Sequence, residues 1–526
     1  MSFYSVELPY QFDAVRYYAA LADLPWAVWL DSGGMGCYDI LTAVPQRTLV
    51  LHEEPTRSDP FALLRKELGE QVAPIADVPF AGGALGYWGY DLARKMYALP
   101  GAAEDAWHLP DMAVGIYDWA LVLDHQQRSA RLVSHQRFAE TAELLPQILL
   151  RLQSDAIIPP DTFRVQGKIT SNFTPDSYAS AFAAVQNYLQ AGDCYQINLA
   201  QRFSAAATGD ALGAYLTLRS LSPAPYSAFL NLPQVQVLCA SPERFLRVQN
   251  GNVETKPIKG TRPRSSDARQ DRQLAEELRN HPKDRAENLM IVDLLRSDLG
   301  KSCAPGSVRV PKLFEVESFA SVHHLVSTVE GKLAKGRDTL DVLRDCFPGG
   351  SVTGAPKLRA MQIIEQLEPN RRGIYCGAIG YVGFDGNMDT NIVIRTLVYS
   401  DNEISCWAGG GIVADSDVAA EYQETLDKAS AKMCIRDRSV AVTPAIAAVC
   451  GIAASSRKTR WRCCVRSVAA MSKWICRPVW IGMRYALASN NMACAIPIAL
   501  QLRRPQPFPT LSACRLVLSQ LTKTSS

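Results

Sequence analysis

The chain has 526 residues, 48% of them hydrophobic and 20% charged, a globular composition with enough length for two domains. Its formal net charge of +3 comes from 55 Lys and Arg against 52 Asp and Glu. Residues 434–526 hold 14 of these basic side chains and a single acid, Asp437. Residues 1–433 therefore form a mildly acidic body with a net charge of −10, and a strongly basic tail follows.

Cysteine usage and the apolar runs argue against a secreted or membrane-spanning protein. Seven of the 14 cysteines lie singly in the body, from Cys37 to Cys406, without a CxxC pair, as expected in a reducing compartment. The first residues lack the basic and apolar regions of a signal peptide. Two uncharged apolar runs, 440–454 and 485–502, are interrupted by prolines and do not predict a bilayer span. We expect a cytoplasmic protein.

The tail, residues 434–526, has clustered cysteines and no sustained amphipathic period. One interpretation is a basic arm that binds nucleic acid. The other is out-of-frame or contaminating sequence joined near 433–438, which would be non-native or disordered. We favour the second interpretation, and so expect neither a nucleic-acid nor a membrane partner.

Residues 1–153 show a mixture of strand and helix patterns and are expected to form an N-terminal domain. Its glycine-rich segment, 79–87, favours close strand packing over phosphate binding, because no basic residue or helix cap follows it at once. Residues 112–124 and 130–134 predict two strands about the polar turn at 126–128.

Residues 154–171, which are polar and contain a Pro-Pro pair, predict a linker to a second domain at 172–433. A helix follows the linker, with Thr174 as its cap, Pro175 in its first turn and Gly192 at its end. Its apolar residues fall at helical spacing: Tyr178, Phe182, Val185 and Leu189. Strands and helices then alternate to about residue 432.

Two predicted helices, 284–294 and 421–428, carry acids on one face. In the first, Glu287 shares a stripe with Ile291, Leu294 and Asp298. In the second, the face is formed by Glu421, Glu424 and Lys428. One interpretation is a solvated face with a Glu424–Lys428 pair. The other is that carboxylates from both helices bind Mg²⁺, which prefers oxygen ligands. No thiolate or histidine cluster indicates zinc.

Two glycine-rich segments could bind an anion. Residues 347–357 predict a loop that enters a helix, but Ala355 follows Gly354 where a Walker loop needs lysine. The loop amides and the Thr353 hydroxyl could still hold a carboxylate. Residues 409–411, three glycines, offer similar amides after a strand. Turn formation explains either segment alone, whereas both together with Arg395 and Lys428 favour a polyanionic small molecule.

Lys259 is the sharpest single candidate. It stands between Pro257, which fixes the backbone, and Gly260, which lets another group approach closely. A lysine is a nucleophile only when neutral, which requires a desolvated or cationic surrounding. The alternative for a lone lysine in a loop is surface solvation.

An ordered set of eight motifs carries a resemblance to the chorismate-utilising enzymes. Their positions are 241–245, 257–261, 284–298, 322–327, 347–357, 387–396, 409–413 and 421–428. The resemblance spans about 175–432, and the N-terminal region is similar to the N-terminal domain of anthranilate synthase component I. It implies an α+β fold, a four-layer α/β/β/α sandwich with the site between the two sheets. Family chains end soon after the last motif, so the tail departs from the pattern.

Two positions discriminate within the family. Aminodeoxychorismate synthases carry lysine at the position of Lys259, where anthranilate and isochorismate synthases typically carry alanine. Isochorismate synthases place a water-activating lysine where this chain has Gln196. The chain thus resembles the aminodeoxychorismate synthase component I branch, which makes 4-amino-4-deoxychorismate for 4-aminobenzoate and folate synthesis. The alternatives are anthranilate synthase component I and a catalytically silent chorismate- or tryptophan-binding regulator, and a complete site argues against silence.

The resemblance also implies residue roles. Mg²⁺ would be held against a chorismate carboxylate by Glu287, Glu421 and Glu424. The other carboxylate end would be bound by Arg395, Lys428, Gly409, Gly410 and Gly411, assisted by Thr353 and Tyr375. Lys259 would add to ring C2 as the C4 hydroxyl leaves, with Glu243 as general acid, and ammonia would then expel Lys259. His324 would orient the reacting region.

The resemblance further implies binding partners beyond chorismate. The body contains no glutaminase domain with a cysteine nucleophile, so ammonia is expected from a separate glutamine amidotransferase subunit. Some family members bind tryptophan near the N-terminal domain, and Ser32, Pro225 and Tyr226 partly match that site.

Overall fold

The computed structural model describes residues 3–52, 59–319 and 322–433. Both interpretations of the tail concern residues 434–526, which lie outside the described residues, and they stay predictions. Within the described ranges, no helix is long and apolar enough to cross a membrane.

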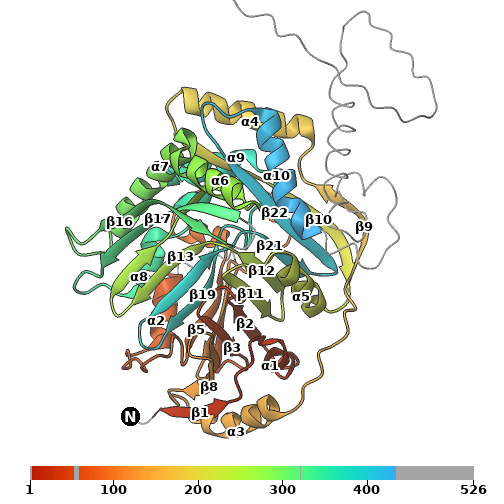
Figure 1. Ribbon diagram of the computed structural model, residues 1–526, viewed down its shortest axis with the longest axis vertical. Coiled ribbons are helices and arrows are strands. Elements are labelled where there is room, and N and C mark those ends of the chain that lie inside the picture. Colours follow the sequence, from red (N-terminus) through yellow and green to blue (C-terminus); the bar gives the residue numbers. More distant parts are fainter. Residues whose placement is uncertain (1–2, 53–58, 320–321, 434–526) are drawn as a thin grey trace, which may run out of the picture. The chain divides into compact units, whose positions relative to one another are not determined.

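Two antiparallel sheets form the centre of the described part of the chain (Figure 1). The 12-stranded sheet has the order β1 (Tyr4–Leu8), β8 (Ser129–Ser134), β7 (Ala120–Asp124), β3 (Tyr38–Thr42), β2 (Ala27–Asp31), β11 (Tyr226–Asn231), β12 (Gln236–Ser241), β21 (Thr396–Ser400), β22 (Glu403–Ile412), β10 (Gln196–Thr208) and β18 (Gly354–Ala355), with β9 (Arg164–Ser171) also paired to β10. The ten-stranded sheet has the order β15 (Ile258–Pro263), β17 (Val322–Lys332), β14 (Asn252–Thr255), β13 (Arg244–Gln249), β20 (Met388–Ile392), β19 (Ala378–Gly383), β5 (Gly83–Trp88), β6 (Met112–Tyr117) and β4 (Arg47–Leu51), with β16 (Arg309–Ser318) paired to β17.

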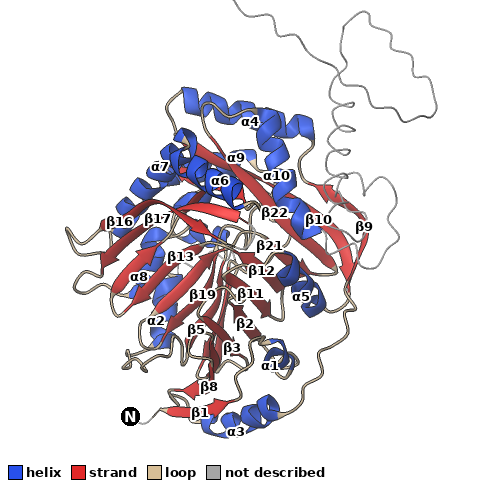
Figure 2. Cartoon of the chain, in the orientation of Figure 1, coloured by secondary structure: helices blue, strands red, loops and turns tan. Residues whose placement is uncertain are grey.

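Helices lie at the periphery of these sheets (Figure 2). They are α1 (Val15–Ala19), α2 (Pro60–Leu68), α3 (Glu140–Gln153), α4 (Pro175–Gln190), α5 (Ala211–Leu221), α6 (Ala268–Asn280), α7 (Pro282–Leu299), α8 (Thr339–Cys346), α9 (Lys357–Leu367) and α10 (Val418–Met433), with short 3-10 turns η1 (Tyr90–Lys95) and η2 (Gly350–Val352). Helices α4, α9 and α10 lie over the end of the 12-stranded sheet that contains β10 and β22 (Figure 1).

Alternation along the strands gives the 12-stranded sheet two differently packed faces. Val28 of β2 belongs to the core shared with the other sheet, whereas its neighbour Trp29 belongs to the core shared with α1, α3 and α5. Ala228 and Phe229 of β11 divide in the same way. Helices α2, α7 and α8 pack their apolar side chains against the ten-stranded sheet. The layers are therefore helix, sheet, sheet and helix, as predicted.

Strands from both predicted domains pair with one another in each sheet. Strand β2 pairs with β11 in the 12-stranded sheet, and β5 pairs with β19 in the ten-stranded sheet. Segments 1–153 and 172–433 thus share both sheets, and their division into domains stays a prediction. The predicted linker, 154–171, contains β9, because its second half forms hydrogen bonds with β10.

The helix predicted after Thr174 is confirmed as α4. Thr174 Oγ1 accepts a hydrogen bond from the backbone N–H of Ser177 at 3.1 Å, and Pro175 occupies the first turn. Gly192 follows the helix with a φ of 78°, a conformation that glycine adopts without strain. Local capping residues were therefore sufficient to place both ends of this helix.

The prediction of one strand over 112–124 is wrong. Strand β6 lies in the ten-stranded sheet, whereas β7 lies in the other sheet. The chain crosses between them at Asp118, whose Oδ2 accepts hydrogen bonds from Phe138 N (2.9 Å) and Thr141 Oγ1 (2.7 Å). The residues on both sides of Asp118 are apolar and fully buried, so the sequence pattern conceals the crossing.

The glycines of segment 79–87 serve close strand packing, as predicted. Gly83 and Gly86 belong to β5, which lies between β19 and β6. A Cβ atom on Gly83 would lie 2.3 Å from the carbonyl oxygen of Val382, and one on Gly86 would lie 2.2 Å from that of Ala113. Side chains at these positions would therefore collide with the backbone of the neighbouring strands.

Gly83→Ala is expected to destabilise the protein, because the new methyl group meets backbone atoms that cannot rotate away and Gly83 has a φ of 141°. We expect a loss of about 1–3 kcal/mol in the free energy of unfolding, measured as a lower thermal midpoint. Gly101→Ala is the matched control, since a Cβ atom there has nothing within 4 Å. Equal midpoints for the two variants would contradict this role of Gly83.

Candidate functional site

Lys259 lies near the start of β15 and is half-buried. Its Nζ donates a hydrogen bond to the carbonyl oxygen of Ser351 at 3.2 Å. Burial lowers the pKa of Lys259, and the negative charges of Glu287 and Glu243 only partly oppose this effect. The surface-solvation alternative does not fit this environment, which shifts the pKa of Lys259 toward the neutral amine that a nucleophile requires.

Glu243 lies between β12 and β13 and is buried, with 5% of its surface exposed. Its Oε1 accepts a hydrogen bond from Ser351 Oγ at 2.9 Å. Burial raises the pKa of Glu243, while Lys259 and the Ser351 hydrogen bond act in the opposite direction. A carboxyl group with a raised pKa is a better proton donor near neutral pH.

Ser351 thus connects the two reactive candidates, and the sequence alone did not point to it. Its carbonyl oxygen contacts Lys259, its hydroxyl contacts Glu243, and 5% of its surface is exposed. It belongs to η2 in the glycine-rich segment 347–357, and that segment is the one sequence feature that could have drawn attention to Ser351. A lone serine in a loop has no spacing that would reveal two partners about a hundred residues away in the chain.

The acids of α7 and α10 influence one another electrostatically. Burial raises the pKa of Glu421, whose Oε1 accepts a hydrogen bond from Ser416 Oγ at 2.7 Å, and the charge of Glu424 raises it further. Burial also raises the pKa of Glu287, with a further contribution from Glu421. Within the described residues, no three His, Cys, Asp or Glu side chains are grouped closely enough to hold a metal ion.

The predicted Glu424–Lys428 pair is present on α10, with its atoms 2.5 Å apart and both side chains about half exposed. Lys428 Nζ also donates a hydrogen bond to the carbonyl oxygen of Gly409 at 2.9 Å. Gly410 lies beneath the acids, because a Cβ atom there would be 2.7 Å from Glu421 Oε2. This face of α10 is therefore partly exposed to solvent and partly in contact with the glycines of β22.

The expectation that residues 409–411 follow a strand is wrong. These glycines lie inside β22, opposite Leu199 and its neighbours in β10, because the ladder continues to Ile412. The pairing of β21 with β22 ends at Cys406, so the glycine segment is paired only with β10 among the described strands.

Arg395 has no hydrogen bond or ion pair with any described side chain. Burial lowers its pKa, with Glu243 acting in the opposite direction, but a guanidinium remains charged in proteins. Its backbone has a φ of 52°, between β20 and β21. A half-buried cation without a counter-ion favours an anionic ligand.

His324 of β17 is 3% exposed, and its Nδ1 lies 2.9 Å from Thr261 Oγ1. Burial, assisted by the charge of Arg395, lowers the pKa of His324 to about 4, so the imidazole is neutral at physiological pH. It can therefore orient a polar group without adding charge to the site.

Thr353 and Tyr375 have their own partners in the fold. Thr353 is fully buried, and its Oγ1 donates to the carbonyl oxygens of Gly349 (3.1 Å) and Gly350 (3.3 Å). The ring of Tyr375 stacks on Trp407 with centroids 6.2 Å apart. Their substrate-binding roles stay predictions.

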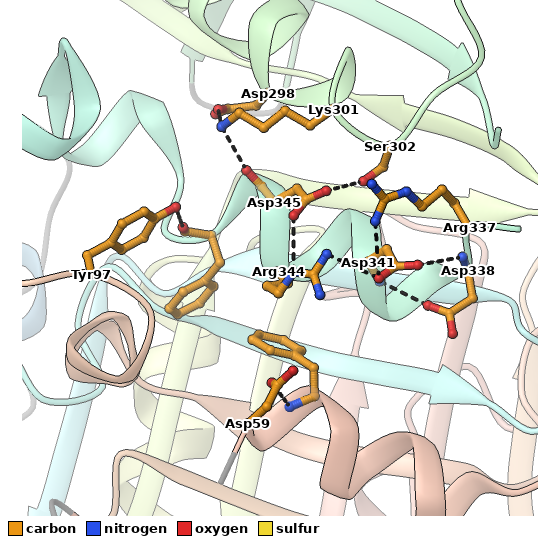
Figure 3. Close-up of polar contacts among 12 residues, drawn as sticks. Asp59, Tyr97, Asp298, Lys301, Ser302, Arg337, Asp338, Asp341, Arg344 and Asp345 are labelled. Atoms are coloured by element: carbon orange, nitrogen blue, oxygen red, sulfur yellow. Dashed lines mark hydrogen bonds and ion pairs between the residues drawn. The ribbon is translucent and has the colours of Figure 1, made fainter. Parts of the chain in front are cut away.

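A buried ion pair connects α7, the helix that carries Glu287, to α9. Asp298 of α7 lies 2.5 Å from Nζ of Lys357, the first residue of α9. Figure 3 shows the adjoining contacts: Lys301 Nζ donates to Asp298 Oδ1 at 2.9 Å, and Ser302 Oγ donates to Asp345 Oδ2 of α8 at 2.5 Å. These bonds join α7, α8 and α9 around the glycine-rich segment.

A cavity of about 820 Å³ contains the three residues predicted to bind tryptophan. Ser32, Pro225 and Tyr226 all line it, and Ser32 Oγ is buried without a hydrogen-bond partner among the described residues. The cavity wall also includes Pro242 and Ile258, the residues that directly precede Glu243 and Lys259.

Glu421→Gln should raise the stability of the unliganded protein at neutral pH. Because the folded-state pKa of Glu421 lies above its unfolded value, the charged carboxylate destabilises the fold, and stability falls as pH rises through the folded pKa. We expect the variant to melt about 1 °C higher at neutral pH and to lose less stability as the pH rises above the pKa of an exposed carboxyl group. Thermal scans across pH measure this.

Glu140→Gln, in the exposed first turn of α3, is the matched control for losing a carboxylate at a helix start. A Glu421→Gln variant that melts lower than wild type at neutral pH would show that the carboxylate stabilises the fold, contrary to the direction of its pKa shift.

The family of chorismate binding enzymes matches residues 27–433. The chain is 48% identical to aminodeoxychorismate synthase component 1 of Klebsiella aerogenes over 443 residues, covering 80% of this chain and 96% of that protein. It is also 48% identical to the Escherichia coli K12 protein of the same name over 442 residues, with the same shares covered, 80% and 96%. It is 41% identical to anthranilate synthase component 1 of Streptomyces coelicolor over 420 residues, covering 76% and 81%.

The fold matches that of anthranilate synthase component I from Streptococcus pneumoniae, with a TM-score of 0.68 and 33% identity, covering 76% of this chain and 92% of that one. The fold of the menaquinone-specific isochorismate synthase from Escherichia coli is also similar, with a TM-score of 0.64 at 19% identity, covering 83% and 94%. The predicted fold class and the resemblance carried by the eight motifs are confirmed. The chain belongs to the family of chorismate binding enzymes.

Proposed function

We propose that this protein replaces the C4 hydroxyl of chorismate with an amino group, giving 4-amino-4-deoxychorismate for 4-aminobenzoate and folate synthesis. The observation that carries the proposal is the arrangement of half-buried Lys259 with buried Ser351 and Glu243. It provides an amine with a lowered pKa beside a carboxyl group with a raised pKa. The names of the relatives at 48% identity support the same reaction.

In the first half of the proposed reaction, the lone pair of Lys259 forms a bond to ring C2. The ring double bonds shift, the C4–O bond breaks, and Glu243 donates the proton with which the hydroxyl leaves as water. In the second half, ammonia attacks C4 and the double bonds shift back. The C2–N bond then breaks, Lys259 is released, and the Glu243 carboxylate takes up the proton that ammonia loses. Neutral His324 orients the reacting region.

The substrate is a dianion, and the site offers cations and amides for one end of it. Arg395, which has no counter-ion among the described side chains, and Lys428 would bind one carboxylate together with the amides of Gly409, Gly410 and Gly411. Thr353 and Tyr375 would assist. Binding the anion would also remove the cost of leaving Arg395 unpaired.

Mg²⁺ is proposed as the cofactor. We propose that its ligands come from Glu287, Glu421 and Glu424, which need not all bind at once, because Mg²⁺ requires only one or two carboxylates besides substrate and water. The charge of Glu424 raises the pKa of Glu421 and that of Glu421 raises the pKa of Glu287, an effect that a bound cation would offset. The bound cation would neutralise the second carboxylate of chorismate.

Ammonia is proposed to come from a glutamine amidotransferase subunit. The relatives are called component 1, which fits a second component, and no glutaminase motif was found in the body of this chain. The 820 Å³ cavity is proposed to hold tryptophan beside Ser32, Pro225 and Tyr226. The thiols that form no disulfide, such as those of Cys303 and Cys346, suit the proposed cytoplasmic location.

Product identification distinguishes this function from anthranilate formation. We expect the isolated chain, given chorismate, Mg²⁺ and ammonium at raised pH, to form a product that keeps the enolpyruvyl group. Mass spectrometry of the product and an assay for free pyruvate measure this. One control sample contains a chelator in place of Mg²⁺, and a second contains glutamine in place of ammonium. Released pyruvate with anthranilate would support the alternative, against which Lys259 argues. Glutamine hydrolysis by the pure chain would contradict the separate donor.

Lys259 should form a covalent adduct with a slowly reacting chorismate analogue, found on the peptide that contains it. Lys259→Ala should show no adduct and should lower kcat by roughly 100-fold or more, the scale of losing a positioned catalytic group. Residual turnover at high ammonium is expected, because direct attack by ammonia remains open in an ordered site. Lys259→Arg should also fail, since its guanidinium stays protonated.

The matched control is Lys256→Ala, which removes a nearby lysine that is paired with Glu317 at 2.6 Å. This variant should still form the adduct. Normal turnover in Lys259→Ala, or an adduct on another residue in wild type, would contradict the role of Lys259.

A further inference from the structure

Strand β10 carries two amide side chains without hydrogen-bond partners among the described residues. Gln196 is 0% exposed, and both its Oε1 and its Nε2 are unpaired. Asn198 is 7% exposed, and its buried Oδ1 is unpaired. Buried polar atoms in proteins are nearly always paired, so an unpaired group in a native fold indicates a functional demand. Two such groups on one strand indicate a ligand contact.

The two amides lie against the glycine segment of β22. Residues two apart in a strand point to the same face, so Gln196 and Asn198 share a face of β10. A Cβ atom on Gly409 would lie 2.7 Å from Asn198 Oδ1, and one on Gly411 would lie 2.4 Å from Gln196 Nε2. The unpaired amides therefore line the same segment whose Gly409 carbonyl accepts the Lys428 hydrogen bond.

The backbone of Asn198 is fixed on both sides. Its N–H donates to the carbonyl oxygen of Thr353 at 2.9 Å, and its own carbonyl accepts from Arg372 Nη2 at 2.6 Å. Arg372 is 1% exposed and also donates to the carbonyl oxygen of Val352 at 2.9 Å. Its charge is balanced by Glu368, 2.6 Å away. The backbone that carries the unpaired Oδ1 is therefore fixed before any ligand arrives.

We propose that Oδ1 of Asn198 accepts a hydrogen bond from a reacting group at C4 of the substrate, an inference that rests on the proposed function. The carboxylates of chorismate have no hydrogen to donate, so they cannot satisfy this oxygen. Two reactants carry a suitable donor: the C4 hydroxyl, which leaves, and ammonia, which replaces it. Both are O–H or N–H donors at the same ring carbon, and Asn198 is thereby a substrate-contacting residue.

The test uses Asn198→Leu in the full chain, because leucine has a similar size and no acceptor. Two measurements separate the sources of the donor. Calorimetric titration with chorismate and Mg²⁺, without ammonia, reports the hydroxyl contact, and the ammonium KM of turnover reports the ammonia contact. We expect a loss of about tenfold in one of them, which corresponds to about 1.4 kcal/mol. The thermal midpoint of the free protein should be unchanged or higher, because an unpaired buried oxygen has been removed.

Asn172→Leu is the matched control, since its side chain is already paired. Its Oδ1 accepts from Arg202 N at 2.8 Å, and its Nδ2 donates to Asn370 Oδ1 at 3.1 Å. This variant should melt lower and leave both binding measurements unchanged. The opposite signs of the two stability changes separate a ligand contact from a structural contact.

If Asn198→Leu does not fold, Asn198→Ala takes its place, and a marked fall in the midpoint of both variants would overturn the proposal by showing that the side chain supports the fold. Chorismate affinity and ammonium KM both within about twofold of wild type would overturn it as well. Wild-type protein that makes no 4-amino-4-deoxychorismate would instead remove the proposed function, so the two failures are distinguishable.

Discussion

Desolvation of charged groups at this site is the constraint on which the proposed chemistry depends. Burial lowers the pKa of Lys259 and raises that of Glu243, so each group moves toward its neutral form. In water, neutral pH would give an ammonium and a carboxylate, the wrong forms for a nucleophile and an acid. Ser351 contacts both groups and fixes their separation. The same burial leaves Arg395 without a counter-ion among the described side chains, which favours an anionic substrate.

The sheets and their helices hold these groups through buried polar bonds. The Asp298–Lys357 pair joins α7 to the start of α9. Arg372, which is paired with Glu368, donates hydrogen bonds to the carbonyl oxygens of Val352 and Asn198. Buried ion pairs are weak contributors to net stability, because desolvation offsets much of their attraction. Their geometry matters more here, since they fix the glycine-rich segment and β10 relative to one another.

Several groups at the site are poorly satisfied in the unliganded protein. The amides of Gln196 and Asn198 are buried without partners among the described residues, and burial raises the pKa values of Glu287 and Glu421. Each of these features opposes folding, and each would be relieved by a ligand of complementary charge or hydrogen-bonding capacity. Groups that oppose folding in the free protein are expected to lie at functional sites, where a ligand can satisfy them.

The sequence by itself determined the features that depend on near neighbours. Thr174 and Pro175 placed the start of α4, and the ordered motifs identified the family. Only the tertiary structure decided the crossing between sheets at Asp118 and the double contact of Ser351, whose partners lie 92 and 108 residues away in the chain. The physical reason is that capping and periodicity act over a few residues, whereas burial and its effect on a pKa depend on every element that closes around a group.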